Sequence, residues 1–257
     1  MGKQPNGTGF QGRRYAMKRM IGCILLLFLC GLQGLKAQQY TGMTGLIHTP
    51  SAEMNDAGTA RIGAHFLHEA FSPAPMDYPT GSYYLNITPF SWIELAYTCT
   101  LLKGESAPGY EEKIGYTHQD RYFSLKLRPL KEGKWWPAIA LGTNDPIGTY
   151  GTKKGSLYFS NFYVAASKRV YLGRNELAAH VAWRTFRRDY NAKWEGFTGG
   201  LTFRPAFAPN LRVIAEYTGH EVNVGFDYLL WKHFLLQISF QQGKQFSGGI
   251  CYQLNLF

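Results

Sequence analysis

Apolar and polar residues alternate along most of the chain from residue 59 onwards. In the run TARIGAHFLH, Ala60, Ile62 and Phe66 fall on one side of an extended chain, and Arg61 and His65 fall on the other. A period of two residues indicates β-strands, and no helical periodicity is sustained. The alternation predicts about twelve strands, within residues 59–68, 82–89, 92–101, 121–129, 138–142, 158–167, 177–188, 196–205, 211–217, 222–228, 234–241 and 248–256.

The two faces of these strands differ in composition. One face carries aliphatic residues with aromatic residues near the strand ends, and the other carries mostly Gly, Thr, Ser, Asn and Gln with a few charges. Aromatic girdles on the outside, with small and polar residues lining the lumen, are typical of outer-membrane barrels. We therefore expect an all-β protein, an antiparallel transmembrane β-barrel of about 12 strands (10–14). A secreted β-sandwich with a binding role is the alternative, and it would carry charged residues on its outer faces.

The connections between the predicted strands are uneven in length. The turn TGHE at 218–221 is short, whereas the loop at 103–120 is long. Transmembrane barrels have short turns at the inner end and long loops at the outer end. We therefore expect connections of these two kinds to separate the two ends of the barrel.

The first 37 residues have the composition of a secretory signal peptide. Basic residues without acids precede the apolar run at 21–32, which is too short to span a bilayer, and Ala37 supplies a small residue for cleavage. We expect cleavage after Ala37, and a lipoprotein signal at Cys23 or Cys30 is the weaker interpretation. The expected domains are the signal peptide at 1–37, a periplasmic segment at 38–58 that leads into the barrel, and the outer-membrane β-barrel at 59–257.

The formal net charge of +10 comes largely from the leader. The chain has 27 Lys and Arg against 17 Asp and Glu, and six of the basic residues but none of the acids precede residue 38. The rest is 21 basic against 17 acidic, so charge gives no reason to expect nucleic acid as a partner. Cys99 and Cys251 then remain, without metal-type spacing, and the sequence leaves open whether they pair.

Three stretches resemble motifs of the YjbH-type family, outer-membrane β-barrel proteins associated with exopolysaccharide. GLIHTPSAEMNDAGTARIG, at 45–63, resembles the opening motif of that family, through Gly45, Pro50, Ser51, Ala52, Asp56 and Gly58. PAIALGTNDPIGT, at 137–149, resembles its Gly-x-x-Asp-x-x-Gly-Thr segment, through Gly142, Asp145, Gly148 and Thr149. AEYTGHEVNVGFDY, at 215–228, resembles its Glu-Tyr and Asn-x-Gly strand pair. The three stretches keep the order of the family.

The resemblance implies a short, single-barrel member in the outer membrane of a Gram-negative bacterium. It implies a non-enzymatic role in the secretion or surface assembly of an exopolysaccharide or capsule. The partners that follow are outer-membrane lipid, the exopolysaccharide and polysaccharide-export proteins. No cofactor is implied, and the oligomeric state is not predicted.

The residues themselves give little sign of catalysis. His65 and His68 are expected on opposite sides of a strand, and the sequence lacks the common hydrolase, metalloprotease and nucleotide-binding motifs. We expect no catalytic residue and no metal site. An outer-membrane lipid-modifying enzyme remains the alternative, because such sites scatter a Ser, a His and an acid over several strands. Asp145 is expected to organise its own turn, in Asn-Asp-Pro followed by Gly148.

Charged residues at polar-face positions are expected to line the lumen. One interpretation is a set of salt bridges that fills a narrow barrel, and the other is a basic lining that meets an acidic polysaccharide. A barrel of this size can be open or filled by side chains, and the sequence does not decide between them. The residues concerned are Arg61, Glu94, Lys126, Arg128, Arg184, Arg204, Arg212, Glu216 and Asp227.

Overall fold

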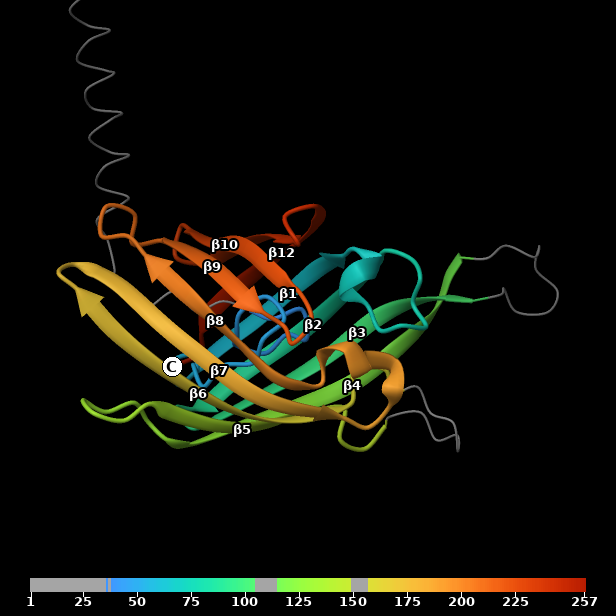
Figure 1. The fold of residues 1–257 in the computed structure, drawn as a ribbon, viewed down its shortest axis with the longest axis horizontal. Helices are drawn as coiled ribbons and strands as arrows, with labels where there is room; N and C mark the ends of the chain where they lie inside the picture. Colours follow the sequence, from blue (N-terminus) through green and yellow to red (C-terminus); the bar gives the residue numbers. More distant parts are fainter. Residues whose placement is uncertain (1–35, 37, 105–114, 149–156) are drawn as a thin grey trace, which may run out of the picture. The chain divides into compact units, whose positions relative to one another are not determined.

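The computed structural model describes residues 36, 38–104, 115–148 and 157–257. Twelve antiparallel strands form one sheet, which closes into a barrel when β1 pairs with both β2 and β12 (Figure 1). The strands are β1 (Thr59–Leu67), β2 (Thr80–Phe90), β3 (Ile93–Gly104), β4 (Gly115–Leu130), β5 (Ala138–Asn144), β6 (Asn161–Leu172), β7 (Asn175–Phe186), β8 (Gly196–Arg204), β9 (Leu211–Tyr217), β10 (Val222–Leu230), β11 (Phe234–Gln241) and β12 (Gln245–Asn255).

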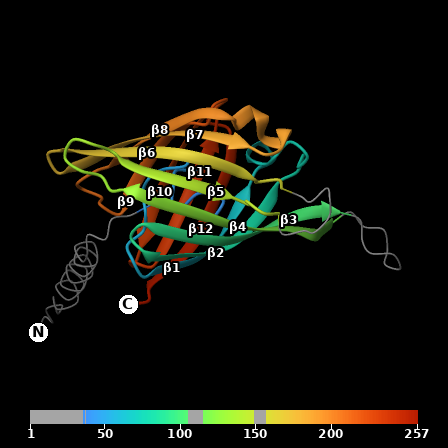
Figure 2. The ribbon, with the colours of Figure 1, turned by 90° about the horizontal axis from the view of Figure 1, so that it is seen from below.

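The closed sheet confirms the predicted barrel, and the sandwich alternative is wrong. Every strand pairs with two neighbours, so the sheet has no open edge. Strands of the near and far walls cross obliquely in Figure 2, as the tilted strands of a barrel do. No helix among the described residues is long and apolar enough to cross a membrane.

The two ends of the barrel differ in their connections. Thr59 at the start of β1 pairs with Asn255 at the end of β12, so both lie at one end, which we call the terminal end. Connections at this end run from two residues, between β6 and β7, to seven residues, between β4 and β5. The opposite end, the loop end, carries the short helices η1 (Glu69–Phe71) and η2 (Asp189–Trp194) within longer connections.

Connection length therefore separates the ends only in part. The four-residue turn at 218–221 lies at the loop end, on the same side as the connection between β3 and β4. That connection is also shorter than expected, because β3 continues to Gly104 and β4 begins at Gly115. The first residues of β4 are exposed on both faces, so they lack the apolar alternation that identifies a strand in sequence.

The alternation of the strands separates the exterior from the interior as predicted. Exposed aliphatic and aromatic side chains cover the outside, whereas polar side chains at the intervening positions are buried inside. Large exposed rings lie toward both ends, with Trp92 and Trp231 at the terminal end, and Trp183 and Tyr217 toward the loop end. Such an apolar exterior with two aromatic girdles is that of a membrane-spanning barrel.

The interior is occupied by the chain itself. Residues 38–55, which we call the luminal segment, are all buried, and their blue trace lies within the ring of strands in Figure 1. The sequence predicted a periplasmic segment that leads into the barrel, and the structure places residues 38–55 of it inside the lumen. An eight-stranded barrel is filled by its own side chains, so twelve strands leave room for an extra piece of chain.

Candidate functional site

The luminal segment turns twice inside the barrel. Isolated bridges join Gln38 to Thr44 and Gly45 to Pro50, and the N–H of Leu46 donates to the carbonyl of Thr49 at 3.0 Å. Gly42 adopts a positive φ of 78°, and a Cβ there would lie 2.8 Å from the side chain of Tyr84. The N–H groups of Gln39 and Gly42 also donate within the segment, and several of its other polar backbone groups are satisfied by the barrel wall.

The first wall contact is an ion pair between β3 and β4. Lys126 Nζ lies 2.8 Å from Glu94 Oε2, and both side chains are fully buried. Glu94 Oε1 accepts hydrogen bonds from the N–H of Thr44 at 2.7 Å and from its hydroxyl at 2.8 Å. Lys126 donates to the carbonyls of Thr44 at 2.7 Å and Glu53 at 2.8 Å. The pair therefore binds the luminal segment on both sides of its inner turn, at Thr44 and at Glu53.

The second wall contact is the carboxylate of Glu216 on β9. It accepts the backbone N–H groups of Ile47 at 3.2 Å, His48 at 2.9 Å and Thr49 at 2.9 Å. The side-chain amide of Asn223 donates to the same carboxylate at 2.9 Å. Hydrogen bonds to a charged group contribute about 1.5–3 kcal/mol each, so Glu216 is a strong anchor for the innermost turn.

Arg212 forms the third wall contact and joins two acids. Its guanidinium lies 3.0 Å from Asp227 on β10, and 2.8 Å from Glu53 in the luminal segment. Burial alone would raise the pKa of Glu53, but Arg212 and the neighbouring cations hold that pKa well below its usual range. Glu53 is therefore charged at neutral pH and fixes the end of the luminal segment that leads to β1.

The fourth contact centres on His48. Its ring stacks on Tyr40 at 4.8 Å between centroids and lies 4.2 Å from the ring of Trp194, and its Nδ1 accepts a hydrogen bond from Arg184 at 2.9 Å. Burial, with the nearby guanidinium of Arg184, lowers the pKa of His48 well below its ordinary value. Arg184 also donates to the carbonyls of Trp194 and Thr218, so it ties the segment to loops at the loop end.

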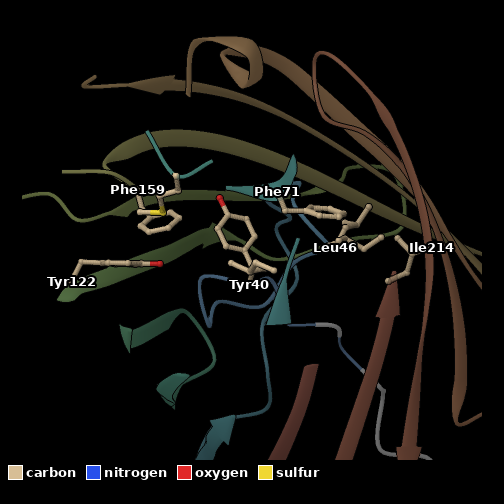
Figure 3. Packing of buried hydrophobic residues seen from close by; sticks show 9 residues of the cluster. Tyr40, Leu46, Phe71, Tyr122, Phe159 and Ile214 are labelled. Atoms are coloured by element: carbon tan, nitrogen blue, oxygen red, sulfur yellow. The ribbon is translucent and has the colours of Figure 1, made fainter. Parts of the chain in front are cut away.

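An apolar cluster covers the luminal segment on the side of the loop end. Leu46 and Tyr40 of the segment pack with Phe71 and Phe159 from the long connections and with strand residues such as Ile214 (Figure 3). The charged contacts lie at two levels. Glu216 and Arg184 lie near the loop ends of β9 and β7, beside this cluster, whereas Glu94, Lys126 and Arg212 lie nearer the terminal end.

A small cavity of about 40 Å³ lies at the terminal end of the lumen. Its lining includes Glu53, Arg128, Ser167, Arg169 and His180. Ser167 Oγ lies 2.9 Å from His180 Nδ1 and also accepts the N–H of Ala52 at 2.9 Å. A cavity of this size holds about one water molecule.

Residues 37–257 match the family described as exopolysaccharide biosynthesis protein YbjH. The chain belongs to the YjbH family. It is similar to the uncharacterized lipoprotein YjbH of Escherichia coli K12, with 26% identity over 265 residues, which cover 85% of this chain and 35% of that protein. This member of the family thus spans about a third of the length of that relative.

Solved outer-membrane barrels are also similar in structure to this YjbH-family chain. The COG4313 outer membrane channel of Pseudomonas putida F1 aligns with a TM-score of 0.43 and 10% identity, over 80% of this chain and 98% of that one. Outer membrane phospholipase A of Escherichia coli aligns with a TM-score of 0.35 and 13% identity, over 78% and 98%.

The motif residues of the YjbH-family chain fall into two groups. Gly45, Pro50, Ser51 and Ala52 lie in the luminal segment, and Asp56 and Gly58 follow it at the terminal end. Gly142 and Asp145 lie in and after β5, and the N–H of Gly148 donates to Asp145 Oδ1 at 3.1 Å. Burial, with the nearby charge of Asp120, raises the pKa of Asp145 to about 6. Thr149 and the cleavage site at Ala37 lie outside the described residues.

Most of the residues proposed to line the lumen are buried inside the barrel and many are paired, whereas Arg128 and Arg204 are only half-buried. Arg61 donates to Gln38 and Gln253, at 2.6 and 2.9 Å, and Arg204 lies 3.3 Å from Glu176. The sequence did not single out Glu53, which supplies the acidic partner of Arg212 and Arg169. The ionic arrangement resembles the salt-bridge interpretation more than a free basic lining.

Several anchors were missed because they belong to an irregular segment. Thr44, His48 and Thr49 lie in a stretch without periodicity, and Asn223 belongs to the polar face that the sequence described only by residue type. The available signal was an unusually polar stretch with few charges beside the first strand. Cys99 and Cys251 are both free and buried, so they form no disulfide with each other.

Proposed function

We propose that the chain is a non-enzymatic outer-membrane β-barrel of a Gram-negative bacterium that assists secretion or surface assembly of an exopolysaccharide or capsule. Polysaccharide-export proteins would be its partners, and the signal peptide would be removed after Ala37. The description of the family and the apolar exterior of the barrel support this proposal. The polysaccharide and the export proteins are inferred from the family alone.

The mechanistic part of the proposal rests on the filled lumen. Glu94, Lys126 and Glu216 use their charges to bind the luminal segment rather than to line an open path. In this state the barrel acts as a membrane-embedded support for an export assembly, and the polymer passes elsewhere. This favours an accessory role over that of a conduit.

A deletion strain tests the proposal. We expect the strain to release less surface or secreted polysaccharide, and plasmid-borne wild-type chain to restore it. The chain should sediment with the outer membrane and migrate faster on gels when it is not boiled. Unchanged polysaccharide in the deletion strain, across growth conditions that induce its synthesis, would contradict the proposal.

The second candidate is an esterase, because Ser167 and His180 form a hydrogen-bonded pair beside a cavity. A serine nucleophile activated by a histidine has this geometry. However, His180 Nε2 faces the hydroxyl of Thr202 at 3.3 Å rather than a carboxylate, and Ser167 Oγ is already engaged by Ala52.

The variant Ser167→Ala separates the two candidates. The accessory role predicts that this variant restores polysaccharide in the deletion strain as fully as the wild-type chain does. An esterase would lose its function with the nucleophile, so failure of a correctly folded Ser167→Ala barrel to complement would favour the enzyme. Lipid mass spectra of the same strains provide the independent readout.

A further inference from the structure

A groove of about 590 Å³ opens on the outside of the barrel at the terminal end. It lies where β3, β4 and β5 meet, and it is lined by Trp92, Leu127, Arg128, Pro129, Lys131 and Leu141. The groove is separate from the luminal contacts described above, although Arg128 lines both it and the small inner cavity.

The groove arises from an interruption of the sheet. Strands β4 and β5 pair at Leu127 and Leu141, and next at Leu130 and Ile139, with a shift of register between the two pairs. Pro129 lies in this interval, and proline has no N–H to donate to a neighbouring strand. The wall therefore opens locally instead of continuing as a regular ladder.

The lining combines apolar side chains with two cations and no acid. Leu141 and Trp92 are exposed to 45% and 51%, so they offer apolar surface to the membrane. Arg128 Nη2 donates to the carbonyl of Ser91 at 2.6 Å, but its buried Nε has no hydrogen-bond partner. Within the described part of the chain, neither Arg128 nor Lys131 forms an ion pair. The groove thus offers positive charge beside an apolar surface.

The depth of the groove matches that of lipid headgroups. The connection between β4 and β5 carries Trp135, which is exposed to 81%, and Trp136, whose indole N–H donates to the carbonyl of Lys131 at 3.2 Å. Lys168 donates to the carbonyls of Gly133 and Lys134 and so fixes the connection. Exposed tryptophans mark the membrane–water boundary, and short connections mark the periplasmic side of such barrels.

We infer that this groove is a binding site for an anionic glycerophospholipid of the periplasmic leaflet. Its phosphodiester contacts Arg128 and Lys131, and an acyl chain lies against Leu127, Leu141 and Trp92. Arginine binds phosphate oxygens through several N–H groups at once, and each cation near an anionic membrane surface favours the anion. The site does not depend on the polysaccharide role.

Native mass spectrometry tests the site. The full chain is reconstituted into nanodiscs of phosphatidylethanolamine and phosphatidylglycerol, released, and examined for retained lipid. We expect the wild-type chain to retain phosphatidylglycerol above its bulk share. Lys131→Gln should lower this preference about fivefold, as the loss of roughly 1 kcal/mol per cation implies. Arg128→Gln should act in the same direction.

Arg174→Gln is the matched control, because Arg174 is an exposed cation in another connection at the same end. It should leave the preference unchanged. Lys131 is exposed and its substitution should not affect folding, which heat-modifiable migration on gels verifies for each variant. The site is refuted if Lys131→Gln retains phosphatidylglycerol as the wild-type chain does. It is also refuted if Arg174→Gln lowers retention equally, since the whole rim would then act as a diffuse charge.

Discussion

The carboxylate of Glu216 accepts the backbone N–H of Thr49 at 2.9 Å, although 167 residues separate them in the sequence. The contact joins a barrel strand to an irregular stretch of chain that has no strand or helix to satisfy its backbone. A buried N–H without a partner costs about 1–3 kcal/mol, so wall carboxylates are a physical condition for keeping chain inside the lumen. The predictions below follow from these contacts.

Glu216→Gln should weaken the binding of the luminal segment to the barrel wall. Glutamine keeps one acceptor oxygen and places an amide N–H₂ toward backbone N–H groups, so we expect a loss of about 2–3 kcal/mol in the free energy of unfolding. Urea titration of the purified barrel in detergent measures this loss. Glu69→Gln, at an exposed site in η1, is the control and should change little. Equal stabilities of the two variants would argue against the anchor.

Lys126→Met should destabilise the barrel more strongly than a surface change. It leaves the buried carboxylate of Glu94 without its cation, and breaking a buried pair costs about 3–5 kcal/mol. The double variant Glu94→Gln/Lys126→Met removes both charges and should recover part of that loss. A double-mutant cycle in the same titration gives the coupling, and strictly additive losses would show that the pair is not coupled.

Stability should fall as the pH drops below about 6.5, the usual pKa of a histidine in an unfolded chain. In the folded barrel the pKa of His48 is well below this value, so only the unfolded chain takes up the proton. Each pH unit then costs about 1.4 kcal/mol for this group. His48→Gln should flatten the dependence between pH 6.5 and 5 by that amount, and the remaining slope reports the other histidines. An unchanged slope would mean that His48 is already exposed.

Gly58 and Asp56 should differ sharply in their tolerance to alanine. Gly58 has a φ of 81°, and its N–H and carbonyl bond to Thr88 and Leu256, beside the seam that closes the barrel. Alanine in this conformation costs roughly 1–2 kcal/mol. Asp56 pairs with Lys36 but its side chain is 72% exposed, so Asp56→Ala should cost less than about 1 kcal/mol. Unfolding titrations compare the two, and equal losses would contradict this ranking.

The sequence predicts the wall of this barrel well. Alternation locates all twelve strands and their buried faces, and it places the first strand at Thr59, where β1 begins. It succeeds because each strand contacts lipid on one side and polar groups on the other, so the pattern records the environment residue by residue. It fails at the start of β4, where residues 116–118 are exposed on both faces and no such contrast exists.

The interior could not be predicted in the same way. Turn chemistry explains why Gly42 and Pro50 bend the luminal segment, but not that the segment is buried. Its burial depends on Glu94, Lys126 and Glu216, which come from three distant strands and meet only when the sheet closes. The salt-bridge interpretation listed both members of two pairs that form, Lys126 with Glu94 and Arg212 with Asp227, but it did not predict which residues pair. The role of Glu216 as a backbone acceptor had no sequence signal.

Thiol labelling of a Thr49→Cys variant tests most directly whether the luminal segment occupies the barrel. Thr49 is fully buried, and the native Cys99 and Cys251 are buried too, so the wild-type chain gives the background. Lys244→Cys, in the exposed turn between β11 and β12, gives the rate of a free site. In the folded barrel, a charged maleimide should leave Thr49→Cys unlabelled while it labels Lys244→Cys completely, and heat unfolding should make the two equal. Labelling of folded Thr49→Cys at the rate of Lys244→Cys would show that the segment lies outside the lumen.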